Sequence, residues 1–435
     1  MKRLFFFCLM PIFLPAYLCA ADYFDRLEFL TPNPVGSGAR ALGMGGAFIA
    51  IADDATAASW NPGGLVQLGS PEASVVSDMF HRTEDNTFST NPSGNGIQRV
   101  SEANLNYLSA AYPFEFLERN MIVSLNYQRL YDFTRNWNFS IIRDSEGTTS
   151  DYHQNGELSA IGIAYGVRVV RNFYLGFTLN FWDNGLTPNQ WKQEMSVAGK
   201  GNVNGYDFKS LYKSTDSYSF KGFNANIGLL WRPIEKLTIG AVLKTPFKAD
   251  IQHEKSLHSS LQYTDIPDFD PLPYNASSSE DETLTMPLSF GIGIAYRFTH
   301  NFMTSFDIYR TEWNDFVHTD SEGNDTSPIT GKSFDESDIR PTHQIRIGAE
   351  YLIITQKYII PLCAGLFYDP APAQGSPDDI FGVSLGSGIG IGKFHIDLAY
   401  QYRFGNSIGD SILKNLGFSQ DLREHTLYSS VVFHF

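Results

Sequence analysis

The chain has 435 residues, of which 43% are hydrophobic, 14% aromatic and 18% charged, and its formal net charge is −15. This apolar and aromatic content excludes a disordered chain, and the acidic balance excludes a nucleic-acid surface, which needs clustered basic residues. Three cysteines are too few for a zinc-finger array or a disulfide scaffold. The composition therefore favours a folded, aromatic-rich protein without a nucleic-acid partner.

The N-terminus has the pattern of a cleavable export signal. Basic residues at 2–3 precede an apolar stretch, 4–16, that is too short to span a bilayer, and a Cys-Ala-Ala sequence precedes Asp22. We therefore predict a signal peptide over residues 1–21 and an exported mature chain. The alternative is a lipoprotein acylated at Cys19.

The next segment, 22–71, is rich in Gly, Ala and Pro and contains no long alternating strand. Its core, GARALGMGGAFIAIADDATAASWNPGGL, predicts a short helix capped by Asp54 and then a turn, since Asn and Gly suit turns and Pro disfavours helix in the residue before it. The turn residues are Asn61, Pro62, Gly63 and Gly64. We expect a compact N-terminal hatch of short helices and turns that fits inside a barrel.

Two chemical interpretations of the hatch are not supported by its surroundings. A G-x-G-x-x-A string begins at Gly36, but no strand precedes it, so a dinucleotide-binding loop is not predicted. Asp53 and Asp54 have no supporting cluster of His or Glu, so capping and hydrogen bonding are favoured over a metal site.

From residue 72 onward, apolar residues recur with a period of two, which predicts strands with one apolar and one polar face. These stretches reach about 10 residues, which is longer than most soluble strands and long enough for a tilted strand to cross a bilayer. We expect Phe177 to face lipid and Thr178 to face the lumen. The polar face also carries charged residues that suit a wet lumen, namely Arg297, Asp307, Arg346, Glu350, Asp397 and Arg403.

Fourteen alternating segments can be counted, an even number as a closed single-chain barrel requires. They lie near 72–81, 102–113, 121–133, 156–168, 172–182, 218–231, 236–249, 284–298, 301–311, 341–351, 357–367, 380–391, 393–404 and 425–435. The sequence thus predicts an all-β fold, a 14-stranded antiparallel transmembrane β-barrel over residues 72–435, with the hatch in its lumen.

The predicted connectors alternate between short and long, which is the pattern of outer-membrane barrels with short periplasmic turns and long outer loops. The long connectors are 82–101, 134–155, 183–217, 250–283, 312–340, 368–379 and 405–424. Four aromatic residues at predicted strand ends suit interfacial girdles, namely Trp182, Trp231, Trp313 and Tyr351. The final strand ends in Phe435, and a terminal aromatic residue on an alternating strand is typical of bacterial outer-membrane proteins.

Several stretches together resemble the FadL-type outer-membrane channels for hydrophobic compounds. Besides the hatch core and the terminal aromatic strand, they are IGLLWRPIEKLTIGAVLKTPFKADI (Ile227–Ile251), RTEWNDF (Arg310–Phe316), HQIRIGAEY (His343–Tyr351) and CAGLFYDPAP (Cys363–Pro372). The resemblance covers essentially the whole mature chain. It implies a fourteen-stranded barrel with an N-terminal hatch inside it, in agreement with the strand count.

The resemblance also implies passive uptake of long-chain fatty acids or of aromatic or aliphatic hydrocarbons across the outer membrane of a Gram-negative bacterium, without a cofactor. The family's Asn-Pro-Ala hatch motif maps to Asn61, Pro62 and Gly63, and Gly63 departs from the usual alanine. The partners we expect are hydrophobic small molecules, outer-membrane lipid and lipopolysaccharide, and the barrel-assembly machinery, which would recognise the strand that ends at Phe435.

For the ligand path, we expect apolar residues of the long connectors 183–217 and 250–283 to form a capture groove, although each could simply pack the loops together. The candidates include Trp191, Leu211 and Leu261. In the hatch, Phe29, Phe48 and Trp60 would hold the ligand. A lateral exit would need a bulge or kink in a strand, and residues 126–129 are the candidate position.

Two other function classes remain as alternatives. An outer-membrane component of a protein secretion or assembly system would have the same fold. An enzyme would need a nucleophile, a base and an orienting group together, but the histidines are scattered and no nucleophile motif lies near them. We therefore expect no catalytic residues.

Overall fold

The structure is a computed structural model that describes residues 36–143, 146–203, 205–266, 272–410, 412–413 and 416–435. The predicted signal peptide and Phe29 lie outside these residues. Three short helices, α3 (Ala39–Gly43), α4 (Ala57–Trp60) and η1 (Pro62–Gln67), form the hatch. No helix in the described part of the chain is long and apolar enough to cross a membrane.

All the strands belong to one antiparallel sheet, which closes because β1 pairs with β20. The wall is built from β1 (Glu72–Phe88), β2 (Gly96–Phe116), β3 (Arg119–Asp132), β4 (Arg135–Arg143), β5 (Glu146–Val170), β6 (Phe173–Asp183), β7 (Asn189–Val203), β8 (Tyr206–Ile234), β9 (Leu237–Lys244), β10 (Phe247–Tyr263), β11 (Leu272–Met286), β12 (Ser289–Arg297), β13 (Phe302–Thr311), β16 (Thr342–Ile354), β17 (Tyr358–Tyr368), β18 (Ile380–Ile391), β19 (Phe394–Ile408) and β20 (Phe418–His434).

Four wall strands are interrupted, so that each appears as two consecutive elements: β3 with β4, β6 with β7, β9 with β10, and β11 with β12. The two elements of each pair are hydrogen-bonded to the same neighbouring wall strand. For example, β8 pairs with β7 over residues 206–219 and with β6 over residues 221–231. The described residues therefore form a closed barrel of 14 strands, and the predicted fold class is confirmed.

The extent of several strands differs from the prediction. The segments 82–101, 134–155, 183–217 and 250–283, expected as loops, are largely hairpins formed by β1 with β2, β4 with β5, β7 with β8, and β10 with β11. Their outward side chains are polar, so the apolar alternation that marks a lipid-facing strand is missing. Cross-strand hydrogen bonds nevertheless continue the ladder beyond the apolar band.

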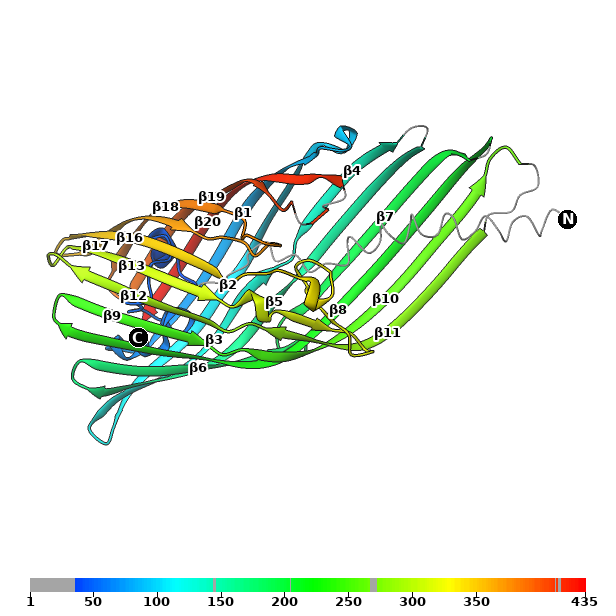
Figure 1. Cartoon of the computed structure of the whole chain (residues 1–435). Helices are drawn as coiled ribbons and strands as arrows, with labels where there is room; N and C mark the ends of the chain where they lie inside the picture. Colours follow the sequence, from blue (N-terminus) through cyan, green and yellow to red (C-terminus); the bar gives the residue numbers. More distant parts are fainter. Residues whose placement is uncertain (1–35, 144–145, 204, 267–271, 411, 414–415) are drawn as a thin grey trace.

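These hairpins make the barrel much longer on one side, and in Figure 1 they extend to the right. The direction toward these hairpins is called upper, and the direction toward the short turns at the opposite end is called lower. We call the tall part the extension: β4, residues 146–158 of β5, β7, residues 206–221 of β8, β10 and β11. The boundary is visible on β8, where the outward Phe223 is 48% exposed and the next outward residue is Lys221. Lys221 pairs with Asp183 at 2.9 Å on the outer surface. The extension therefore stands above the apolar, membrane-spanning band.

The alternation within the band agrees with the prediction. Phe177 is 38% exposed on the outer face, whereas Thr178 is fully buried and donates a hydrogen bond to the hatch carbonyl of Ala58. Of the four predicted girdle residues, Trp231 and Tyr351 are exposed as expected. Trp182 and Trp313 are 4% and 1% exposed, so their assignment to the girdle was wrong.

The hatch lies inside the lower, closed part of the barrel (Figure 1). The short helix expected after Asp54 is α4, but the predicted cap was wrong, since the N-cap is Thr56. Asp54 lies before the helix and accepts the Thr56 backbone N–H. The expected turn follows at Asn61, whose Oδ1 accepts the Gly63 N–H at 3.1 Å. Asn61 Nδ2 also donates to Leu229 O in the wall, so the turn is tied to the barrel.

Candidate functional site

Three cavities lie along the inner side of the wall, the first within the extension and the last beside the hatch. The upper cavity, of about 60 Å³, is lined by Trp191, Tyr218, Ile251, Glu282, Leu284, His318, Thr326, Ser327, Pro328 and Gly331. The middle cavity, of about 50 Å³, is lined by Gln128, Leu130, Tyr131, Asn180, Trp182, Asn224, Asn226, Lys244, Thr245, Phe247, Met286, Pro287, Ser289, Tyr309, Thr311 and Trp313. The lower cavity, of about 10 Å³, reaches the hatch at Trp60 and Ile49.

The cavities follow one another along shared strands. On β11, Leu284 lines the upper cavity and Met286, two residues further down, lines the middle one. The middle and lower cavities share Lys244 and Tyr309. A strand rises about 3.3 Å per residue, so the first two cavities are about one side chain apart. The three cavities therefore lie in order from the extension to the hatch.

The upper part of the middle cavity is aromatic. Trp182 and Phe247 stack with their ring centroids 5.9 Å apart, and Trp313 is almost fully buried beside them. The polar edges of the indoles are satisfied, because Trp182 Nε1 donates to Asn224 and Trp313 Nε1 donates to Thr342. Their apolar faces are therefore available to line a cavity that suits hydrocarbon.

The lower part of the middle cavity is polar. The amides of Asn180, Asn224 and Asn226 lie on strand positions closer to the hatch than Trp182. Lys244, at the end of β9, lies with its Nζ 5.4 Å from the centre of the Tyr309 ring. A molecule with an apolar tail and an anionic head would match the two halves of this cavity.

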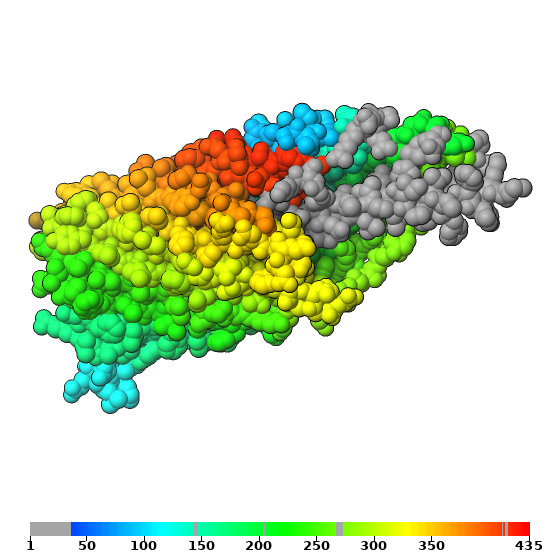
Figure 2. Space-filling view, in the orientation of Figure 1, coloured from blue at the N-terminus to red at the C-terminus, as the bar shows by residue number. Residues whose placement is uncertain are grey.

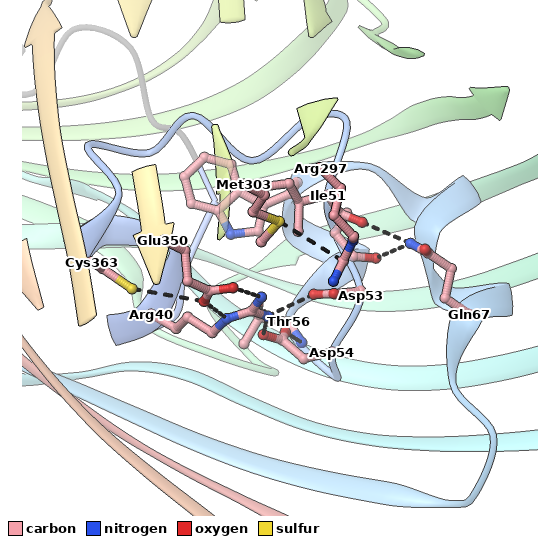
Figure 3. Close-up of polar contacts among 12 residues, drawn as sticks. Arg40, Ile51, Asp53, Asp54, Thr56, Gln67, Arg297, Met303, Glu350 and Cys363 are labelled. Carbon is pink, nitrogen blue, oxygen red and sulfur yellow. Dashed lines mark hydrogen bonds and ion pairs between the residues drawn. The ribbon is translucent and has the colours of Figure 1, made fainter. Parts of the chain in front are cut away.

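An ion-pair network fixes the hatch to the wall below these cavities (Figure 3). The Arg40 guanidinium donates two hydrogen bonds to the wall carboxylate of Glu350, at 2.5 and 2.9 Å, and one to Asp53 at 2.7 Å. Its carbon lies 5.5 Å from the centre of the Phe48 ring. Asp53 and Asp54 of the hatch thus pair with Arg40 of the hatch itself, and Arg40 ties them to the wall through Glu350.

The structure brings together only some of the predicted ligand-binding residues. Phe48 and Trp60 contact each other edge to face at 5.8 Å in the hatch core, where Trp60 lines the lower cavity. Trp191 lines the upper cavity. Leu211 and Leu261 are half-buried in β8 and β10, and neither lines any of the three cavities. The connectors that were expected to form a capture groove form two hairpins instead, β7 with β8 and β10 with β11.

Four residues that line the middle cavity were not predicted to do so, namely Trp182, Trp313, Lys244 and Tyr309. Trp182 had a usable signal, since it is out of phase with the lipid-facing Phe177 and Phe181 of the same strand. For Trp313 no such signal existed, because it lies in the short helix η3 (Trp313–Asp315) after the end of β13. Its inward position depends on how the following loop folds back over the lumen.

Comparison with solved structures supports the same fold. The chain is similar to a Pseudomonas aeruginosa FadL homologue at 14% identity and a TM-score of 0.61, covering 94% of this chain and 100% of that chain. For the Pseudomonas putida toluene transporter TodX the values are 14%, 0.57, 93% and 100%. For the CymD monoaromatic hydrocarbon channel they are 15%, 0.54, 93% and 98%.

The sequence comparison identifies the family. No curated protein sequence matches the chain significantly. The family model described as Outer membrane protein transport protein (OMPP1/FadL/TodX) matches residues 33–408, which is most of the chain. The protein therefore belongs to the OMPP1/FadL/TodX family of outer-membrane transport proteins.

Proposed function

We propose that the protein is a passive outer-membrane channel for the uptake of hydrophobic compounds, and that the three cavities are successive stations on the path. The observation that carries the proposal is their order, from the aromatic interior of the extension to the hatch. The free energy of an apolar molecule falls when it leaves water for an apolar cavity. Entry into such cavities therefore needs no energy input. The solved relatives named as toluene and monoaromatic hydrocarbon channels support the proposal.

Within this class, we propose a long-chain monocarboxylate as the preferred substrate. The aromatic half of the middle cavity would hold the alkyl chain, and the half with Lys244 and the three asparagines would hold the carboxylate. An ammonium group and amide donors stabilise an anion by charge-assisted hydrogen bonds, whereas a plain hydrocarbon gains nothing from them. This arrangement favours an acid over a hydrocarbon of similar size.

The exit that we propose is lateral, beside β3. The register of β3 against β5 shifts between Arg129 and Tyr131, next to the candidate position at 126–129. Bulges of this kind bend a strand and interrupt its ladder. The strand is then interrupted between Asp132 and Arg135, next to Tyr131, which lines the middle cavity.

Uptake of labelled oleate and of a labelled alkylbenzene, by a host that lacks its own channel, tests the function and the substrate together. We expect both to depend on the wild-type gene. Lys244→Met should lower oleate uptake by about tenfold, equivalent to about 1.4 kcal/mol, and leave alkylbenzene uptake unchanged. Lys248→Met, on the exposed outer face of β10, is the matched control and should change neither.

Two results would contradict these proposals in different ways. Equal loss of both compounds in Lys244→Met would reject the preference for an acid but keep the channel. If the folded wild-type protein transports no compound of a panel while its deletion blocks export of other proteins, the secretion component is the better interpretation. Recognition of the Phe435 strand by the barrel-assembly machinery and contact with lipopolysaccharide remain predictions.

A further inference from the structure

The segment 312–341, which connects β13 to β16, covers two of the cavities. We call it the lid segment. Its side chains Trp313, Phe316 and Ile329 are 1%, 1% and 9% exposed and belong to the same apolar cluster as the wall residues of the extension. Trp313 lines the middle cavity, and residues 326–328 line the upper one. In Figure 2 this segment, in yellow, lies where the short side of the barrel meets the extension.

The lid segment has little backbone pairing with the wall. Its strand β14 (Val317–Thr319) pairs with three residues at the end of β11, and β15 (Asp325–Thr326) pairs only with β14 and with Ser333 of the segment itself. Side-chain contacts join it to the wall as well. Trp313 Nε1 donates to Thr342 Oγ1 at 3.0 Å, Ser321 Oγ donates to Glu280 Oε2 at 2.8 Å, and His318 Nε2 contacts Glu282 Oε2 at 2.8 Å.

Glu282 is itself part of a wider array. Its second oxygen, Oε1, contacts His253 Nδ1 at 2.9 Å, and the other nitrogen of that ring contacts Asp216 Oδ1 at 3.0 Å. Lys255 lies 3.6 Å from the same Asp216 oxygen. The array joins β8, β10 and β11 of the extension to the lid segment. All four wall residues stand above the membrane-spanning band.

Several charged groups of the described residues surround His253. Besides Asp216 and Glu282, a third carboxylate is Glu280, which lies opposite His253 in the β10–β11 register and accepts a hydrogen bond from Ser321 of the lid segment. Lys255 is the neighbouring cation, 3.6 Å from Asp216. Loss of the His253 proton therefore removes a positive charge from among three carboxylates.

The environment of the wall residues favours a protonated His253. Burial alone would lower the pKa of His253, but its bonds to Asp216 and Glu282 raise that pKa to about 9. Burial alone would raise the pKa of Glu282, but its bonds to His253 and His318 lower it to about 2. At neutral pH the wall therefore offers His318 an ionised carboxylate that a charged histidine already supports.

We propose that the lid segment is a proton-controlled lid: the His318–Glu282 contact latches it to the extension while His253 is protonated, and deprotonation of His253 releases it and opens the upper cavity to the outside. The role of this opening in uptake rests on the proposed function, whereas the opening itself does not. A neutral His253 leaves Glu282, Glu280 and Asp216 to repel one another, which weakens the wall side of the latch.

The direction with pH follows from linkage. The folded-state pKa of His253 lies above its ordinary value of 6.5, so its contribution is complete below that pH and is lost as the pH rises through about 9. The folded-state pKa of Glu282 lies below 4.5, so its contribution is complete above that pH and is lost as the pH falls through about 2. The lid should be closed near neutral pH and should open in alkali.

Thiol labelling of the purified, folded full-length protein tests the lid without any substrate. Ser327→Cys places a thiol in the upper cavity, where Ser327 is 2% exposed, in a background in which the three native cysteines, Cys8, Cys19 and Cys363, are replaced by serine. Its labelling rate, divided by that of the exposed reference Ser277→Cys, should rise about tenfold between pH 8 and pH 10, which is the change in the neutral fraction of a group of pKa about 9.

Variants of the latch give the second arm. His318→Gln should raise the labelling of Ser327→Cys at pH 7 and remove its dependence on pH, while the control His258→Gln, on the exposed face of β10, should behave as the parent. A thiol equally protected at all pH values, or equally protected in His318→Gln, would overturn the lid. Hydrogen exchange of the 317–319 amides in the unaltered chain, corrected for intrinsic pH dependence, gives the same answer if Ser327→Cys does not fold.

Discussion

The lower lumen and the extension are both filled with protein, but in opposite ways. At the level of the hatch, backbone packs against backbone. In the extension, large side chains and ion pairs pack against one another. A backbone contact cannot adjust without moving a whole strand, whereas a side chain can change rotamer by itself. The difference places rigidity at the hatch and adaptability in the extension.

Glycines make the close packing of the hatch possible. A Cβ atom on Gly365 of β17 would lie 2.2 Å from the Gly45 nitrogen, and one on Gly240 of β9 would lie 2.4 Å from the Ile49 oxygen. The same holds for Gly176 of β6 against Pro62. These wall glycines come from different sides of the barrel, so the hatch is gripped around much of its circumference.

The extension uses aromatic side chains where the lower lumen uses glycine. Trp191, Tyr218 and His253 stack across three neighbouring strands, with ring centroids 4.7 and 4.2 Å apart and nearly parallel planes. The outer side chains of the same strands are polar, since water and not lipid surrounds them. Within the bilayer the apolar side chains lie on the outer face of the wall, and above its upper edge they lie on the inner face.

The largest test of this change compares two outward positions. Phe177→Lys, in the band, should cost about 2–4 kcal/mol in the free energy of unfolding. Ser256→Lys, on the outer face of the extension, should cost less than about 0.5 kcal/mol. Reversible unfolding in lipid measures both. Similar costs at the two positions would mean that the band does not end below β10.

Thr178→Lys sharpens the same test from the inside. Simple alternation predicts a mild effect for a lumenal residue, but Thr178 is fully buried against the hatch and bonded to Ala58. We therefore expect a cost close to that of Phe177→Lys, caused by displacement of the hatch and not by contact with lipid. A mild effect would show that the hatch yields easily.

A test of rigidity at the hatch uses Gly365→Val. Because the obstructing atoms are backbone, the cost should lie near the upper end of overpacking effects, about 3 kcal/mol. Gly147→Val in β5 is the control, since the nearest atom to its Cβ would be Lys200 Cε at 3.9 Å. Chemical denaturation with matched folding yields measures both. If the two variants are equally stable, the hatch is not gripped by the wall.

The smallest effect is expected at the hatch turn. Asn61→Leu removes the donor to Ile49 O and Leu229 O and the acceptor of the Gly63 N–H, so buried groups lose their partners at a cost of about 1–3 kcal/mol. The hatch should loosen, and uptake should change, while the barrel stays folded. Limited proteolysis from the periplasmic side reports the loosening. Asn275→Leu on exposed β11 is the control, and equal resistance of both variants would reject a controlling turn.

The sequence by itself determined the barrel and the position of the hatch turn. Lipid imposes an apolar outward residue at every second position, so a strand such as β6 is legible from its own residues, with Phe177 outside and Thr178 inside. The turn at Asn61 is equally local, because Pro and Gly limit the backbone directly.

Only the tertiary structure decided the extension, the cavities and the lid segment. The upper hairpins have polar outer faces like those of loops, and their strand conformation depends on hydrogen bonds from neighbouring strands. Trp313 and His318 reach the wall because a loop folds back over the lumen, and their partners Thr342 and Glu282 are 29 and 36 residues away. Periodicity describes what a residue shares with its own strand, whereas these contacts depend on which strands lie side by side.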